Sequence, residues 1–468
     1  MLCAVPRRSK EEGAVRDQVV AWAVQGGLET RVDGAGNLLI RKPASAGREA
    51  AAVLVLQGHL DMVCQKNAGC EHDFSRDPIR PQCRDGWLVA DETTLGADNG
   101  LGVALILALL EDREAVHGPL EALLTVDEEA GMGGARGLDA DLVGGRLLLN
   151  LDTEEWGEFY VGCAGGLDVN VERRGPAEMP PAGHRAYRIV LSGLQGGHSG
   201  IDIHRGRGNA IKLLVRVLRD LEGEGLRLSE LRGGTARNAL PRECEAVVTL
   251  PLSGAAALEA RLAEWQALLR RELAGADEGL RLAAVLASPG QVMAPSEQAI
   301  WLASLHAAPQ GVRRMSVAFP GVVETSDNLG VVELGPDGGA CTFMVRSLHG
   351  SGSLALADEI VSLFALSGTR ATPSGQYPGW APQAASPLLV RCQKVYRREF
   401  GAAAGVQVIH AGLECGLIGA RFPGMDMVSF GPTIRGAHAP GERVEIASVE
   451  RCWRLLRAIV AEEAAAGS

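Results

Sequence analysis

Residues 51–61 read AAVLVLQGHLD. The first six are apolar without interruption, which is typical of a strand buried on both faces, as in a parallel sheet. Polar residues follow at once, and His59 and Asp61 stand two positions apart, so on an extended segment both side chains point to the same side. In an open parallel sheet, ligands bind at the carboxyl ends of the strands. This stretch therefore predicts a buried strand that delivers an imidazole and a carboxylate to a site at the sheet edge.

Other predicted strands end in the same kind of residue. Asp98 lies in a turn just before an apolar helix expected at 102–110. Strands that alternate with helices in this way predict an α/β fold, in which these strand ends converge on one crevice. The side chains placed there are Asp127, Glu128 and Glu129 after strand 122–126, Asp152 after strand 147–151, and His438 beyond strand 428–430.

This collection of side chains matches the needs of divalent metals. Carboxylates and imidazoles bind hard or borderline divalent metals, and two ions close together need a bridging carboxylate. Asp61 can bind the free N–H of His59, and Glu128, which points differently from its neighbour, is free to act as a base. An HxD or a DEE alone is usually a surface turn or a solvated loop, but buried carboxylates without a cation cost several kcal/mol. The predicted ligands are His59, Asp98, Glu129, Asp152 and His438.

The pattern of predicted strands and helices changes twice along the chain. After residue 165 a second succession of strands and helices begins, and a Pro- and Gly-rich stretch at 372–382 is typical of a linker. After this stretch the pattern of the first 165 residues returns. We therefore predict a discontinuous domain at 1–165 and 380–468, with a second α/β domain inserted at 166–379.

Composition excludes several classes of function. The 57 acidic residues outnumber the 46 basic ones, giving a formal net charge of −11, which argues against nucleic acid or an anionic membrane as partner. The apolar stretch 99–110 is shorter than the about 20 residues of a membrane span. Glu11 and Glu12 stand where a signal peptide would be apolar, and the 10 cysteines form no CxxC pair, as expected of buried thiols in a reducing compartment. We expect a cytoplasmic protein.

Four motifs resemble those of the M20 co-catalytic metallopeptidases: QGHLDMV at 57–63, GADNG at 96–100, DEEAGM at 127–132 and LNLD at 149–152. Further motifs resemble the aminoacyl-histidine dipeptidase branch of that family. The resemblance extends from about Pro6 to about Glu450. The motifs of the branch are GCAGG at 162–166, GGHSG at 196–200, RNALPR at 237–242, YPGW at 377–380, HAGLECG at 410–416 and SFGPTI at 429–434.

The resemblance implies a zinc-peptidase catalytic domain, with a mixed, mostly parallel sheet flanked by helices, and an inserted lid domain. It assigns one zinc ion to His59, Asp98 and Asp152. It assigns a second zinc ion to Asp98, Glu129 and His438, so that Asp98 bridges, and Co²⁺ or Mn²⁺ are the expected substitutes. Glu128 would be the general base, Asp61 would support His59, and the peptide bond Asp98–Asn99 would be cis.

For the lid, the resemblance implies that His198 steadies the oxyanion and that Asn238 and Arg346 hold the carboxylate of the substrate. The implied substrates are small unblocked dipeptides, with Xaa-His types such as β-alanyl-histidine favoured. An N-acyl amino-acid deacylase on the same metal core is the alternative, and the presence of Glu128 argues against a non-catalytic zinc-binding scaffold. The size of the lid allows either a monomer or a homodimer. His410 and Glu414 are four residues apart, but a strand and a turn are expected there rather than a helical metal pair.

Overall fold

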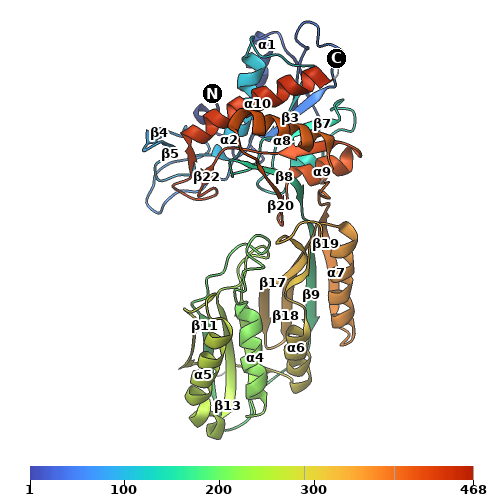
Figure 1. Ribbon diagram of the computed structural model, residues 1–468. Helices are drawn as coiled ribbons and strands as arrows, with labels where there is room; N and C mark the ends of the chain where they lie inside the picture. Colours follow the sequence, from blue (N-terminus) through green and yellow to red (C-terminus); the bar gives the residue numbers. More distant parts are fainter. Residues whose placement is uncertain (289, 384, 467–468) are drawn as a thin grey trace. The chain divides into compact units, whose positions relative to one another are not determined.

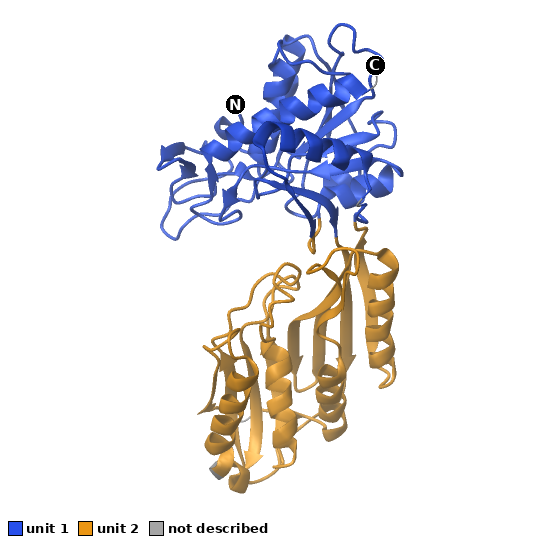
Figure 2. Ribbon diagram, in the orientation of Figure 1, with its two compact units in different colours: residues 1–163, 380–408, 413–468 blue, residues 164–379, 409–412 orange. Residues whose placement is uncertain are grey.

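The computed structural model describes residues 1–288, 290–383 and 385–466, and the chain forms two compact units (Figure 2). Unit 1 consists of Met1–Cys163, Trp380–Val408 and Leu413–Ser468, and unit 2 of Ala164–Gly379 and Ile409–Gly412. Unit 1 is therefore assembled from segments that are far apart in the sequence.

Unit 1 is built on a mixed eight-stranded sheet whose central four strands pair in parallel (Figure 1). Every residue of the central strand β3 (Leu54–His59) is buried, and its first three residues are apolar. Strand β3 lies three residues later than the strand expected at 51–56, and His59 is its last residue. In sheet order the strands are β1 (Glu29–Val32), β2 (Leu38–Lys42), β6 (Leu120–Thr125), β3 (Leu54–His59), β7 (Leu147–Asn150), β21 (Asp426–Ser429), β8 (Glu158–Cys163) and β20 (Gly405–Ile409).

Helices pack against this sheet, which buries their apolar residues away from water. Helix α2 packs on β3, α8 packs on β21, and α10 contacts both helices (Figure 1). The helices of unit 1 are η1 (Leu2–Ala4), α1 (Gly13–Gln25), α2 (Ala97–Glu111), α3 (Gly133–Arg136), α8 (Pro387–Phe400), α9 (Glu414–Arg421) and α10 (Ile446–Ala466). A small sheet beside them has the order β22 (Ile434–Arg435), β23 (Arg443–Glu445), β5 (Trp87–Ala90) and β4 (Pro81–Arg84).

Unit 2 is an antiparallel sheet with helices α4 (Ala210–Glu222), α5 (Leu252–Glu272), α6 (Pro295–Ala307) and α7 (Gly350–Ala365) packed along it (Figure 1). One continuous apolar core joins strands and helices. The sheet order is β14 (Arg281–Leu286), β11 (His184–Ser192), β13 (Cys244–Pro251), β12 (Arg227–Gly233), β17 (Val323–Gly335), β18 (Gly338–Ser347), β9 (Gly165–Arg174) and β19 (Arg370–Tyr377), and β16 (Gly311–Met315) also pairs with β17. Strands β10 (Ala177–Glu178) and β15 (Val292–Met293) form a separate pair.

The linker expected at 372–382 is wrong in its first half. Residues up to Tyr377 belong to β19, which pairs with β9 as the last strand of the sheet. An edge strand tolerates Pro373, because the missing N–H need not face a neighbour. The turn expected at Glu414 is also wrong, since Glu414 is the first residue of α9. Across the described parts of the chain, the helices include none with the length and apolar character of a membrane span.

Candidate metal centre

The carboxyl ends of three neighbouring strands bring the predicted residues of unit 1 together. Strands β6, β3 and β7 lie side by side and run parallel. His59 ends β3, Glu128 and Glu129 follow β6, and Asp152 follows β7. Parallel pairing therefore places these side chains at one edge of the sheet, as the sequence predicts.

Asp98 stands between two imidazoles. Its Oδ1 lies 3.2 Å from His59 Nε2, and its Oδ2 lies 3.2 Å from His438 Nε2. His59 Nε2 is also 3.4 Å from Asp152 Oδ1, and His438 Nε2 is 3.1 Å from Glu129 Oε2. Among the described residues, three groups of possible ligand atoms each have their atoms within 4.8 Å of one another: His59–Asp98–Asp152, Asp98–Glu129–His438 and His59–Glu128–Glu129. The first two groups, which correspond to the predicted metal positions, share Asp98.

Asp61 connects the end of β3 with the loop after β6. Its Oδ1 lies 3.3 Å from His59 Nδ1 and accepts the N–H of Glu128 at 3.1 Å. Its Oδ2 accepts the N–H of Glu129 at 3.1 Å and the hydroxyl of Ser9 at 2.7 Å. Burial acts to raise the pKa of Asp61, but hydrogen bonds, first that with His59, outweigh it and lower the pKa to about 2. Asp61 thus contacts the His59 ring and holds the Glu128–Glu129 loop by its backbone N–H groups.

Burial and the close approach of several carboxylates shift the pKa values of the side chains in the cluster. Hydrogen bonds with Asp98 and Glu129 raise the pKa of His438 to about 11. Burial would lower the pKa of His59, but the charge and hydrogen bonds of Asp152 and its neighbours raise it well above the usual value. Burial raises the pKa of Asp152 to about 6 and that of Glu128 well above its usual range. Each imidazole is thus held by negative charge of the kind that a divalent cation neutralises.

The residues fit a pair of divalent cations. They supply two imidazoles and three carboxylates, the donor set of zinc and related metals. Glu129 Oε1 is buried without a hydrogen-bond partner among the described residues, and such an atom is costly unless a cation binds it. Metal ligands must be deprotonated, so cations bound there would replace the protons that the imidazoles otherwise hold.

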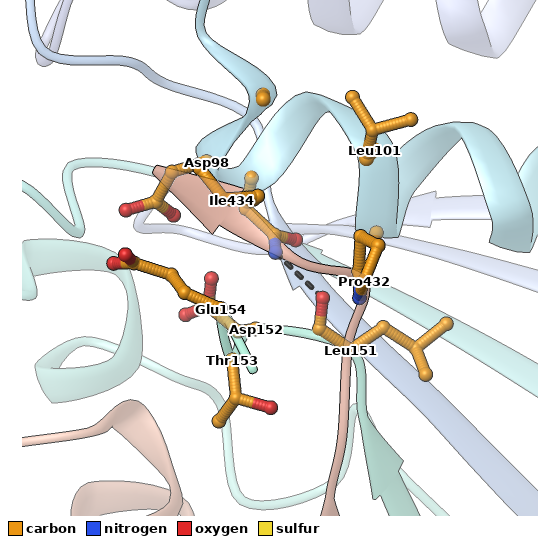
Figure 3. Close-up of a pocket in the computed structure, with 11 residues that line it drawn as sticks. Asp98, Leu101, Leu151, Asp152, Thr153, Glu154, Pro432 and Ile434 are labelled. Carbon is orange, nitrogen blue, oxygen red and sulfur yellow. Dashed lines mark hydrogen bonds between the residues drawn. The ribbon is translucent and has the colours of Figure 1, made fainter. Parts of the chain in front are cut away.

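The cluster opens to solvent on one side. The His438 side chain is 52% exposed, whereas that of His59 is 1% exposed. A recess beside the cluster is lined by Asp98, Asp152 and Glu154, and Figure 3 shows their carboxylates on one side, with Leu101, Leu151 and Pro432 on the other. The recess therefore has an acidic end and an apolar end.

Three functional candidates, Arg7, Glu154 and Glu442, were not singled out by the sequence, and Glu414 was singled out only by its motif and its spacing from His410. Burial raises the pKa of Glu414 to about 7, and its Oε2 accepts hydrogen bonds from Gln57 at 2.7 Å and Thr125 at 2.6 Å. Glu154 lines the recess two residues after Asp152. Arg7 and Glu442 bind the backbone just before Asp98, where Arg7 donates to the Gly96 carbonyl and Glu442 accepts the N–H of Ala97. Their partners are distant in the sequence, so no spacing rule could have found them.

The lid residues predicted from the sequence lie in unit 2, where two of them meet. His198 Nδ1 accepts the N–H groups of Gly200 at 3.1 Å and Ile201 at 3.0 Å, so the neutral ring carries its proton on Nε2. Arg346 Nη2 lies 3.4 Å from that Nε2, and Arg346 Nη1 donates to the Tyr377 hydroxyl at 2.9 Å. Burial, with Arg346 adding to it, lowers the pKa of His198 to about 4. The two side chains thus present neighbouring N–H donors, an arrangement suited to an anionic oxygen.

Asn238 and His410 stand nearby within unit 2. The Asn238 carbonyl accepts the N–H of Ser199 at 2.8 Å, while its side chain is exposed. His410 Nε2 lies 2.7 Å from Ser326 Oγ, and burial lowers the pKa of His410 to about 3. His410 thus pairs with a hydroxyl in unit 2, whereas Glu414 belongs to unit 1, and the two form no metal pair.

The chain is 44% identical to the cytosol non-specific dipeptidase of Escherichia coli (strain K12) over 463 residues, covering 98% of this chain and 96% of that protein. The chain belongs to the M20 metallopeptidase family. The solved aminoacylhistidine dipeptidase from Vibrio alginolyticus superposes with a TM-score of 0.89 at 43% identity, covering 98% of this chain and 94% of the other. This M20 chain falls in the dipeptidase branch indicated by its motifs.

More distant comparisons agree on the fold. A tripeptidase from Staphylococcus aureus superposes with a TM-score of 0.56 at 16% identity, covering 99% of this chain and 96% of that one. Residues 189–277 match the family model of the peptidase dimerisation domain, and they lie within unit 2 of this M20 metallopeptidase. The peptide bond Asp98–Asn99 is cis, as predicted.

Proposed function

We propose that this metallopeptidase hydrolyses unblocked dipeptides, including Xaa-His dipeptides, at the cluster around Asp98. The observation that carries the proposal is the shared position of Asp98 between the two imidazoles, with Glu128 next to the ligand Glu129. The names of the two relatives similar over nearly the whole chain both include dipeptides among the substrates.

We further propose two Zn²⁺ ions, one held by His59, Asp98 and Asp152, the other by Asp98, Glu129 and His438. Divalent ions bound there supply Lewis acidity, which polarises the scissile carbonyl and lowers the pKa of a water molecule. The donor set supports zinc, and Co²⁺ or Mn²⁺ are suitable substitutes because they accept the same ligands.

The protein residues then move the proton and fix the geometry. Glu128 takes the proton of the attacking water and delivers it to the leaving amine, as a general base and then a general acid. Asp61 holds the loop of Glu128 by its backbone N–H, so the carboxylate keeps its place through both steps. In unit 2, the N–H donors of His198 and Arg346 suit the developing oxyanion and the substrate carboxylate, with Asn238 as a further contact.

Substitution of Glu128 tests the proton transfer. Glu128→Gln keeps the shape of the side chain but cannot accept the proton, so the rate of hydrolysis should fall by about 10²-fold or more while bound metal per chain stays unchanged. The assay is hydrolysis of β-alanyl-histidine by the purified protein, with metal analysis of the same samples. Glu111→Gln, at the exposed end of α2, is the control. Unchanged hydrolysis by Glu128→Gln would refute the assigned role.

The rival activity is a deacylase on the same metal core. For a dipeptidase, the expected rate of hydrolysis of β-alanyl-histidine is higher than that of Nα-acetylated amino acids at equal concentration. Faster cleavage of the acetylated compounds would instead favour the deacylase.

We also propose a cytoplasmic homodimer, supported by the match of residues 189–277 to a dimerisation domain and by the relative named as cytosolic.

A further inference from the structure

A single buried carboxylate binds the backbone of the turn that carries Asp98. Glu442 Oε2 accepts the N–H groups of Leu95 and Gly96, both at 2.8 Å. Its Oε1 accepts those of Ala97 at 2.7 Å and Asp98 at 3.2 Å. Four successive N–H groups thus converge on one side chain, and such concave arrangements of backbone donors bind anions.

The carbonyl side of the same turn is bound by a buried cation. Arg7 Nη2 donates to the Gly96 carbonyl at 2.5 Å. Arg7 Nη1 donates to the carbonyls of Leu60 and Asp61, both at 2.9 Å. One guanidinium therefore connects the turn before Asp98 with the segment that follows His59, a task suited to its rigid fork of donors.

The two glycines of the GADNG motif make room for this guanidinium. Gly96 has a φ of 66°, and a Cβ there would lie 2.5 Å from Arg7 Nη2. A Cβ on Gly100 would lie 2.7 Å from the same atom. The backbone thus approaches Arg7 so closely that a side chain at either position would displace it.

Glu442 also fixes the loop that carries the other imidazole. His438 lies four residues earlier, and backbone bonds from Ala439 to Gly436 and from Glu442 to Ala439 keep the loop tight. His438 has a φ of 65°, a left-handed conformation that is strained for a non-glycine residue and needs an external constraint. The anchored carboxylate of Glu442 supplies such a constraint.

We propose that Glu442 and Arg7 are positioning residues that clamp the Asp98 turn from its two sides and set the spacing of His59, Asp98 and His438 for metal binding. The proposal rests on the metal site of the proposed function. Neither side chain touches the reacting atoms. Each acts by holding backbone groups, so its loss should weaken metal affinity before it removes the fold.

The test is Co²⁺ binding to the full chain after chelation, measured by calorimetry and by the visible absorption of the bound ion. Glu442→Gln replaces one acceptor oxygen with an NH₂ group that cannot accept, leaving two of the four N–H groups without a partner. Loss of an outer contact of this kind typically weakens metal binding about 10–100-fold, and that is the expected result. The absorption band should also change shape, since it reports the geometry of the ligands.

Glu121→Gln is the matched control. Glu121 is also buried in unit 1 and accepts the N–H groups of Gly144 at 2.8 Å and Gly145 at 3.0 Å, but it takes no part in the acidic cluster. Its loss should lower stability while leaving Co²⁺ affinity and absorption as in the wild type. Equal Co²⁺ affinity in Glu442→Gln and the wild type, or an equal loss in both variants, would overturn the proposal.

Two conservative variants keep the test valid if Glu442→Gln does not fold. Arg7→Lys keeps the charge but loses the fork, and Glu442→Asp keeps the charge but is too short to reach all four N–H groups. Both should weaken Co²⁺ binding, and wild-type affinity in both would refute the clamp. A wild-type chain that binds Co²⁺ without hydrolysing dipeptides would refute the proposed activity and leave the clamp standing.

Discussion

Asp327 is a carboxylic acid in the core of unit 2. It lies on β17, is 2% exposed, and its Oδ2 has no hydrogen-bond partner among the described residues. Burial raises its pKa to about 7, although the positive charges of Lys212 and Arg313 act in the opposite direction. Since this shift disfavours the ionised form in the folded state, stability should depend on pH.

Between about pH 4 and about 7 the folded chain keeps the Asp327 proton that the unfolded chain has lost. The folded state then binds more protons, so this contribution to stability is fully present below pH 4 and falls as pH rises to 7. Asp327→Asn removes the ionisation, so its free energy of unfolding relative to the wild type should increase over this range by up to roughly 4 kcal/mol. Urea denaturation at pH 4.5 and pH 7.5 measures the difference. Asp337→Asn, on the exposed turn after β17, is the control, and a pH-independent difference for Asp327→Asn would contradict the expectation.

The sequence could bring together four of the five proposed metal ligands because each stands at the end of an apolar strand or at the start of an apolar helix, whereas His438 lies in a loop between β22 and β23. Strand ends of a parallel sheet meet, so His59, Glu129 and Asp152 could be brought together without coordinates. The sequence could not predict Arg7 and Glu442, which bind the backbone near Asp98. Arg7 binds Gly96 across 89 positions, and Glu442 binds Ala97 across 345. A buried charge with backbone partners leaves no periodicity in the sequence around it.

At the scale of elements, helix α4 of unit 2 begins at a side chain with two tasks. Asn209 Oδ1 accepts the N–H groups of Ile211 at 3.0 Å and Lys212 at 3.2 Å, which caps the helix. Its Nδ2 donates to Gln310 Oε1 and to the Leu329 carbonyl, both at 2.9 Å, which joins the helix to the sheet. The cap and the sheet contact are separable by substitution.

Asn209→Ala should lower the free energy of unfolding by about 3 kcal/mol, combining a lost cap and two lost hydrogen bonds of the amide group, at about 1 kcal/mol each. Asn209→Ser keeps an oxygen for the cap and loses only the two hydrogen bonds of the amide donor, so its cost should be about two thirds as large. Chemical denaturation gives both values, and hydrogen exchange in α4 should increase more for alanine. Equal costs for the two variants would show that the cap contributes nothing.

Elements were predictable where apolar periodicity was strong, and composition misled where it was weak. The apolar runs of β6 and β7 lie close to the strands expected at 122–126 and 147–151, and α2 contains the helix expected at 102–110. Strand β19 was missed because its Pro373, Ser374 and Gly375 are typical of a loop. It is a strand because it pairs with β9, a partner about 200 residues earlier that supplies the hydrogen bonds for an exposed edge.

At the scale of the whole molecule, the proposed metal ligands draw together distant parts of the chain. Asp98 and His438 are in contact across 340 positions, and every proposed ligand belongs to unit 1. Unit 2 has a core of its own. A ligand that binds only the folded state stabilises it, by about 2.7 kcal/mol when present at 100 times its dissociation constant. Bound metal should therefore stabilise unit 1 directly and unit 2 not at all.

Hydrogen exchange with and without a chelator tests this asymmetry, because it reports each strand separately. Removal of metal should increase exchange in β3, β6 and β7, whose ends carry ligands, and leave β11 and β13 of unit 2 unchanged. Added Zn²⁺ should restore protection in the wild type. In a variant with Asp98→Ala, which lacks the shared ligand, chelator and Zn²⁺ should have little effect on the same strands. Equal loss of protection in both units, or none in either, would contradict a metal centre built from unit 1 alone.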